Sequence, residues 1–156
     1  MSALWRQIIN SQHDSIALIT DHRGDVLHHN DGFATMSPHT PPHNVFRWTL
    51  LSPEAREGTL RDWAGTWAQA AAFHLQLSQL THPDDTRLTD LVSEVVCDPI
   101  AGPLYARVDH TRAFAAETWR LQHAQWGPGY VQMASAQPSS SHPTTVVFMP
   151  FHGTRL

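Results

Sequence analysis

The sequence contains no lysine, because all ten of its basic residues are arginines. This absence excludes a Schiff-base lysine and the lysine-dependent phosphate-binding loop of many nucleotide hydrolases. The 10 basic residues are also outnumbered by 14 acidic ones, and no basic stretch stands out. Proteins that bind nucleic acid usually present a basic surface, so we expect no direct contact with DNA or RNA.

Cysteine and long apolar runs are equally scarce. Cys97 is the one cysteine, so an internal disulfide is excluded, which fits a reducing compartment. We interpret Cys97 as a small buried apolar residue. No apolar run approaches the length of about 20 residues that crosses a bilayer, and no signal peptide is evident. The sequence therefore predicts a cytoplasmic protein with no membrane contact.

The composition is that of a folded protein. Of 156 residues, 41% are hydrophobic and 15% are charged, which predicts one domain over residues 1–156 with a substantial core. Histidine, with 12 copies, and tryptophan, with six, are frequent. Histidine serves proton transfer and metal ligation, but no His/Cys/Asp cluster has the spacing of a zinc site.

Strands are predicted at both ends of the chain and helices between them. The predicted strands are 16–20, 25–29, 119–123, 130–136 and 145–151, and the predicted helices are 3–11, a short one after the cap Asn30, 52–79, one after Pro83 and 98–105. Because the helices form one block, an alternating βαβ fold is excluded. We expect an α+β fold, with helices packed on one face of a five-stranded antiparallel sheet and a ligand pocket between them.

Five segments, in this order, resemble a known family. They are DHRGDVLHHN, HNVFRWTLLSPEAREGTLRDW, LTDLVSEVV, GPLYAR and LQHAQWG. Together they resemble the ligand-binding domain of MmyB-like transcriptional regulators over roughly residues 4–136. The matched positions include Asn30, Asn44, Phe46, Trp63 and His123. The resemblance implies a PAS-like fold whose pocket takes a small, often apolar molecule such as a fatty acid.

The chain also departs from the family pattern. No helix-turn-helix segment precedes Trp5, so we expect the domain to act as a homodimer or through a partner regulator. Val108 stands where the family often has a histidine, and His110 follows two residues later. Ala124 replaces a proline of the family motif. These departures lie where a ligand is expected, and they imply a different ligand or activity.

The candidate site consists of aromatic residues and histidines. Trp63 and Trp67 lie on the apolar stripe of the predicted 52–79 helix, where core packing and a pocket wall are overlapping interpretations. His123, on a strand, is expected to be hydrogen-bonded to backbone. Asp84 and Asp85 are expected in a solvated loop. The expected ligand-contacting residues are Phe46, Trp63, Trp67, Phe73, His74, Tyr105, His110, Trp119 and His123.

Two hypotheses of different classes follow. The first is a standalone PAS-like sensor domain that holds a small, mostly apolar ligand between sheet and helices. The alternative is a small haem-binding enzyme or haem sensor, with His110 or, second, His74 as the axial ligand, acting on a small metabolite by oxidative or nitrogen-centred chemistry. No nucleophile elbow or glycine-rich phosphate loop is found, so no catalytic residue is assigned.

Overall fold

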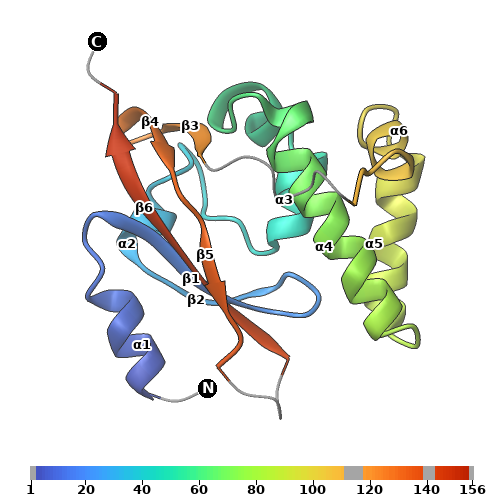
Figure 1. The fold of residues 1–156 in the computed structure, drawn as a ribbon, viewed down its shortest axis with the longest axis horizontal. Helices are drawn as coiled ribbons and strands as arrows, with labels where there is room; N and C mark the ends of the chain where they lie inside the picture. The colour runs from blue at the N-terminus through green and yellow to red at the C-terminus, as the bar shows by residue number, and fades with distance from the viewer. Residues whose placement is uncertain (1–2, 111–117, 139–142, 155–156) are drawn as a thin grey trace.

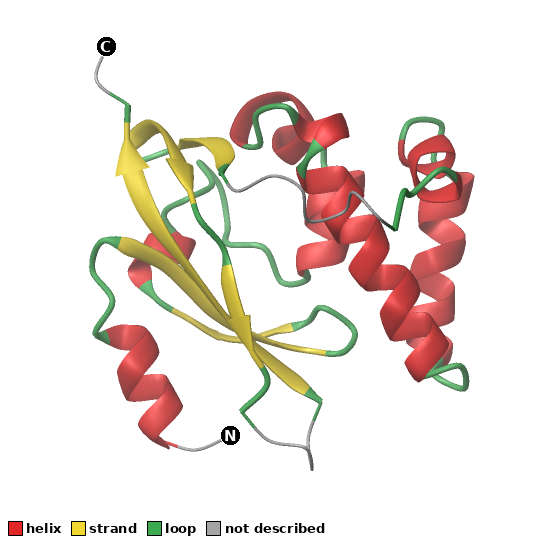
Figure 2. Cartoon of the chain, in the orientation of Figure 1, coloured by secondary structure: helices red, strands yellow, loops and turns green. Residues whose placement is uncertain are grey.

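A computed structural model describes residues 3–110, 118–138 and 143–154. It consists of a β-sheet and a separate block of helices beside it (Figures 1 and 2). The strands are β1 (Ser15–Asp21), β2 (Val26–His29), β3 (Trp119–His123), β4 (Gly127–Val131), β5 (Ala134–Ala136) and β6 (Thr144–Gly153). They form one antiparallel sheet in the order β2-β1-β6-β4-β3, with β5 also paired to β6. The predicted α+β, PAS-like sheet, built from both ends of the chain, is confirmed.

The sheet has six strands where five were predicted. The predicted strand 130–136 is divided into β4 and β5, and both parts pair with β6. Val131 lies opposite Phe151 and Ala134 opposite Phe148, so the register is the same on both sides of the break. The sixth strand therefore arises because one predicted strand is interrupted, and the order of the strands in the sheet is not changed by it.

Strand β1, which lies between β2 and β6, is buried on both faces. Ile16 and Leu18 belong to the core that the sheet shares with the helical block. Ala17 and Ile19 face the other way and pack with Ile9 of α1 (Ala3–Asn10). Figure 1 shows α1 on the side of the sheet opposite to α3–α6. The prediction of helices on one face was thus incomplete, because a continuous apolar strand needs cover on both faces.

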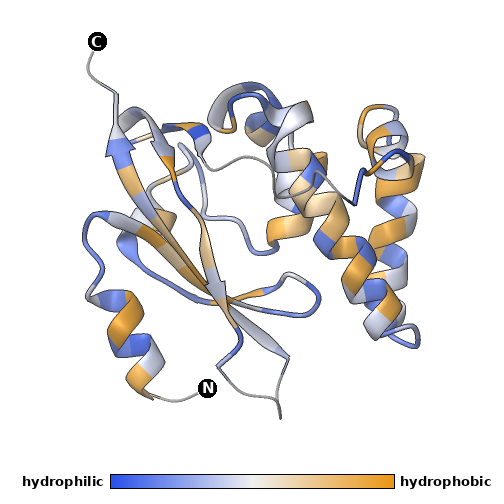
Figure 3. Ribbon diagram, in the orientation of Figure 1, coloured by the Kyte–Doolittle hydropathy of each residue, from blue (hydrophilic) through white to orange (hydrophobic). Residues whose placement is uncertain are grey.

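The helical block follows the second strand. The short helix α2 (Asp31–Ala34) packs against β1 and lies apart from this block (Figure 1). The members of the block are α3 (Val45–Leu51), the π-helical turn η1 (Ala55–Thr59), the 3-10 turn η2 (Trp63–Gly65), α4 (Trp67–Thr81), α5 (Thr86–Cys97) and α6 (Ala101–Ala106). Figure 3 shows apolar residues along the central strands and on α4 and α5. Among the described residues, no helix combines the length and apolar character that a bilayer crossing needs.

The predicted continuous helix over 52–79 was wrong. The chain leaves helical geometry at Leu60, which forms a β-bridge with Leu121 of β3. The next amide, of Arg61, donates to the Arg120 carbonyl at 3.1 Å, and Asp62 has a left-handed φ of 54°. Pairing with a strand distant in sequence has overridden local helix propensity here.

Two other local expectations have opposite outcomes. The cap at Asn30 is confirmed: its Oδ1 accepts from the amides of Ala17 and Phe33, both at 3.0 Å, and its Nδ2 donates to the carbonyls of Gln12 and Ser15, both at 2.8 Å. The buried amide group thus makes all four of its hydrogen bonds. Cys97, by contrast, is exposed rather than buried, because it lies beyond the apolar stripe of α5.

Candidate functional site

One edge of the space between sheet and helices is lined by indole rings. We call Leu60, Trp63, Trp67, Trp119 and Leu121, all buried, the aromatic junction. Trp67 and Trp119 meet edge to face, with ring centroids 5.1 Å apart. The Trp67 Nε1–H donates to the Arg120 carbonyl at 2.9 Å, and the Trp63 Nε1–H donates to the Thr49 carbonyl at 2.7 Å. With these N–H groups bonded to backbone, the ring surfaces that remain are apolar.

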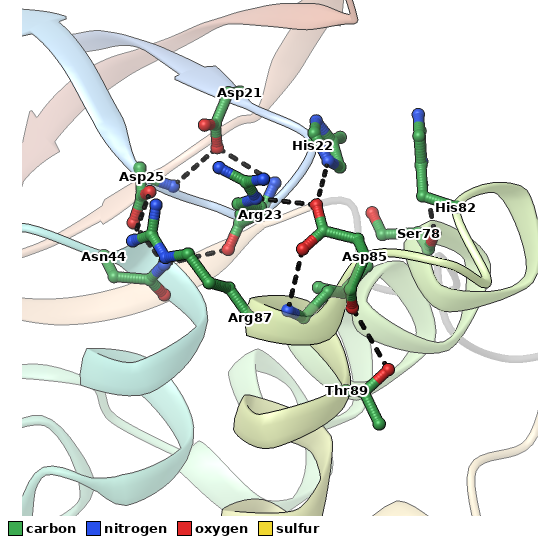
Figure 4. A network of polar contacts seen from close by, with 11 residues as sticks. Asp21, His22, Arg23, Asp25, Asn44, Ser78, His82, Asp85, Arg87 and Thr89 are labelled. Carbon is green, nitrogen blue, oxygen red and sulfur yellow. Dashed lines mark hydrogen bonds and ion pairs between the residues drawn. The ribbon is translucent and has the colours of Figure 1, made fainter.

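The opposite edge is held by charged side chains (Figure 4). We call His22, Arg23, His82 and Asp85 the polar junction. Asp85 Oδ2 accepts from Arg23 Nε at 2.6 Å and from His22 Nε2 at 2.7 Å. The His22 ring stacks on His82, with centroids 4.0 Å apart. These contacts join the β1–β2 turn to the loop between α4 and α5.

Asp85 is the central group of the polar junction. Its Oδ1 also accepts from the Leu88 amide at 3.2 Å, which caps α5. The hydrogen bond from Arg23 holds the pKa of Asp85 well below its usual range, and the bond from His22 adds to this. The side chain of Asp85 is 8% exposed, so the expectation of a solvated loop residue was wrong for Asp85, although Asp84 is exposed. An aspartate three residues before a buried leucine was the signal for this helix cap.

The polar junction is incompletely bonded. The Nδ1 atom of His22 is buried and has no hydrogen-bond partner among the described residues. Such a group is unfavourable, because it has lost water without gaining a partner. Two residues after His22, the ring of Phe46 lies over Gly24, where an added Cβ would come within 2.5 Å of a ring carbon. The predicted site residue Phe46 therefore packs under the β1–β2 turn, near the polar junction.

His123 is held entirely by backbone, as the sequence analysis expected. Its Nδ1 accepts from the amides of Gln125 and Trp126, at 3.1 and 3.0 Å. Its Nε2–H therefore donates to the Gly32 carbonyl, at 2.8 Å. Burial lowers the pKa of His123, against the smaller raising effect of the bond to Gly32. The imidazole is a neutral, fixed part of the interior, and both of its nitrogens are engaged.

The remaining predicted site residues gather on the helical block. Phe73 lies 5.5 Å from His110 and 5.6 Å from His74, between ring centroids. Gln76 links this group, since its Nε2 donates to the Tyr105 carbonyl at 2.8 Å and its Oε1 lies 2.7 Å from His110 Nε2. His74 and His110 are both exposed. Within the described part of the chain, no three His, Cys, Asp or Glu side chains are placed to hold a metal ion. Haem ligation by His110 or His74 stays a prediction.

Two surface hollows accompany these groups. One, of about 90 Å³, borders the polar junction and is lined by Arg23, Asp25, Asn44, Arg47, Arg87, Leu88 and Leu91. The other, of about 420 Å³, lies where α1, α2 and the β3–β4 turn meet. Trp63, Trp67 and Trp119 line neither hollow. Core side chains, including Met36 and Met149, fill the space between the layers, where the sequence analysis expected a pocket.

A comparison with protein-family models gives one match. Residues 1–155 match the model described as "MmyB-like transcription regulator ligand binding domain". The chain belongs to this family. The resemblance drawn from five motifs is therefore confirmed, and the match extends past those motifs to include β6. A search of curated proteins finds no match to this MmyB-like domain.

Proposed function

We propose that this MmyB-like domain binds a small, mostly apolar molecule between its sheet and its helices. In this proposal a partner regulator, or a second copy of the domain, responds to occupancy. The observation that carries the proposal is the aromatic junction, where Trp63 and Trp67 have their N–H groups bonded to backbone carbonyls. Ring surfaces without free polar atoms suit an apolar guest.

A guest between the layers must displace side chains that now fill the interior. Met36 and Met149 are 3% and 6% exposed and lie in the core shared by the two layers. Methionine side chains are unbranched and adapt their shape readily, so they are suited to make way for a ligand. The aromatic rings then form the wall against which the guest packs.

The two edges of the interior differ in how they could respond to a guest. At the aromatic junction the backbones meet through the bridge between Leu60 and Leu121. At the other edge the bridge between Asp25 and Asn44 is accompanied by two ion pairs, in which the arginine side chains, Arg23 and Arg87, are 34% and 65% exposed. Ion pairs near water contribute little and exchange readily for hydration. We therefore place the movable edge at the polar junction.

Binding of N-phenyl-1-naphthylamine, whose fluorescence rises in apolar surroundings, tests the proposal. We expect saturable binding that weakens about tenfold or more in Trp67→Leu, since this change removes most of one ring wall. Trp5→Leu is the matched control, because Trp5 packs on the α1 side of the sheet. If Trp67→Leu and Trp5→Leu weaken dye binding equally, or if neither variant weakens it, the site does not lie at the aromatic junction.

The same purified protein tests the haem alternative. Under the apolar-ligand proposal, native mass spectrometry should find a co-purified apolar molecule. The visible absorption spectrum should then show no Soret band. A Soret band that disappears in His110→Ala would instead establish the alternative and overturn the apolar ligand.

A further inference from the structure

The hollow of about 420 Å³ is separate from the aromatic junction. Three segments form it: the end of α1 with the residues after it, the end of β2 with α2, and the β3–β4 turn. Its lining consists of Asn10, Gln12, His13, His29, Asn30, Asp31, Gly32, Thr35, Gln125 and Trp126. Its volume lies within the range of about 300–1,000 Å³ that is usual for small-molecule sites.

Trp126 gives this hollow a fixed aromatic wall. Its ring stacks on His123, with centroids 4.1 Å apart and planes 9° apart. His123 is in turn held by the Gly32 carbonyl and by two amides of its own turn. Gly32 lets the indole lie against the backbone, because an added Cβ would come within 2.8 Å of a Trp126 ring carbon and 2.4 Å of the Ser15 oxygen. The indole is therefore positioned before any ligand arrives.

The charge of the lining favours a cation. Asp31 is the one formally charged residue among the lining residues, with histidine taken as neutral, and no arginine lines the hollow. Among the described residues, the Asp31 carboxylate has no hydrogen-bond or ion-pair partner. Gln12, Thr35 and Gln125 add side-chain oxygens that can accept hydrogen bonds.

We propose that this hollow binds a small organic cation with an alkylammonium or quaternary ammonium group. Indole is the best ring for cation–π attraction, and the Asp31 carboxylate supplies the opposite charge. An anionic ligand would meet that carboxylate without any arginine to balance it. This inference does not rest on the apolar ligand proposed above, because the two sites share no residue.

Choline and its neutral isostere 3,3-dimethyl-1-butanol test the cation directly. The two probes have nearly the same shape, and only choline is charged. At pH 8, where histidine is ordinarily neutral, choline titrated into ¹⁵N-labelled protein should shift the indole N–H signal of Trp126. At equal concentration, the isostere should change the chemical shift of this signal at least about fivefold less than choline does, because it lacks one cation–π contact.

Variants separate the site from the fold. Asp31→Asn, at an exposed position, should weaken choline binding about fivefold. Trp126→Leu, which lacks the indole signal and is followed at the backbone amide of Gly32, should weaken it about tenfold. Asp90→Asn, which removes an exposed carboxylate on α5, should bind choline like the unaltered domain. Because Trp126→Leu also removes the stacking on His123, Asp31→Asn is the deciding variant. Equal affinity for both probes, unchanged binding in Asp31→Asn, or no Trp126 shift at about 10 mM choline, near the weak limit of specific binding, would overturn the proposal.

Discussion

The aromatic junction and the polar junction both attach the sheet to the helical block, but they do so with different forces. The aromatic junction buries three indoles and pairs Leu60 with Leu121. The polar junction depends on Asp85, on a guanidinium that is 34% exposed, and on stacked imidazoles. Burial of apolar rings is insensitive to salt, whereas ion pairs near water are screened. This difference predicts that the aromatic junction is the more stable edge of the domain and that the polar junction is the edge that opens.

Truncation of a ring in the aromatic junction should have the largest effect. Trp119→Ala leaves a cavity against Trp67, and we expect a loss of about 3–5 kcal/mol in the free energy of unfolding. Urea denaturation followed by circular dichroism measures this loss. Trp5→Ala is the control, since Trp5 is only half-buried, and it should cost less. If both variants lose the same amount, the aromatic junction is not the stronger edge.

Removal of the charge in the polar junction should have a smaller effect. Asp85→Asn keeps an oxygen for the Leu88 amide but loses the carboxylate oxygen that accepts from Arg23 and His22. We expect a loss of about 1–2 kcal/mol, which shrinks as sodium chloride is raised to about 1 M. Asp84→Asn, in the same loop and exposed, is the matched control. A salt-independent loss would show that Asp85 acts through accepted hydrogen bonds that the asparagine NH2 group cannot replace, and not through its charge.

His123 in the interior and Asp85 in the polar junction should respond to acid in different pH ranges. The folded pKa of His123 is lowered, so the unfolded chain binds more protons and stability falls as the pH drops below about 6.5. The pKa of Asp85 is lowered as well, so its contribution remains down to about pH 3.8 and is lost below that. Urea titrations between pH 8 and 5 should show a shallower pH slope in His123→Gln. An unchanged slope would contradict the buried neutral imidazole.

The smallest effect is expected at an ion pair beside the aromatic junction. Arg120 and Asp62 form an ion pair at 3.3 Å, but both side chains are more than half exposed. Arg120→Gln should change the free energy of unfolding by less than about 0.5 kcal/mol. A larger loss in the same urea assay would mean that charge, and not ring burial, holds this edge.

What the sequence could predict was governed by local patterns. The alternation of apolar and polar residues, together with short apolar runs, predicted the strands. Asn30 indicated the end of the hairpin, because helix capping depends on neighbouring residues alone. The break at Leu60 could not be predicted in this way, since it depends on a β-bridge to Leu121, 61 positions later in the chain. The same holds for the polar junction, where Asp85 meets His22 and Arg23 only after the layers have packed together.

The candidate site was predicted in part for the same reason. Trp63 and Trp67 of the aromatic junction were visible as an apolar stripe, although the helix predicted to carry them is broken. His74 and His110 were selected by position, but their exposure depends on how α4 and the segment after α6 pack, which no local pattern encodes. The filled interior is likewise a property of side-chain packing.

Native-state hydrogen exchange tests the central claim most directly, namely that the layers separate at the polar junction while the aromatic junction holds. At the edge that contains the polar junction, the amides of Val26 and Val45 donate to the carbonyls of His43 and Gly24. At the edge that contains the aromatic junction, the amide of Arg61 donates to the carbonyl of Arg120. In Asp85→Asn we predict faster exchange at the amides of Val26 and Val45, with unchanged protection at Arg61. Equal acceleration at all three amides, or acceleration at Arg61 alone, would contradict the account.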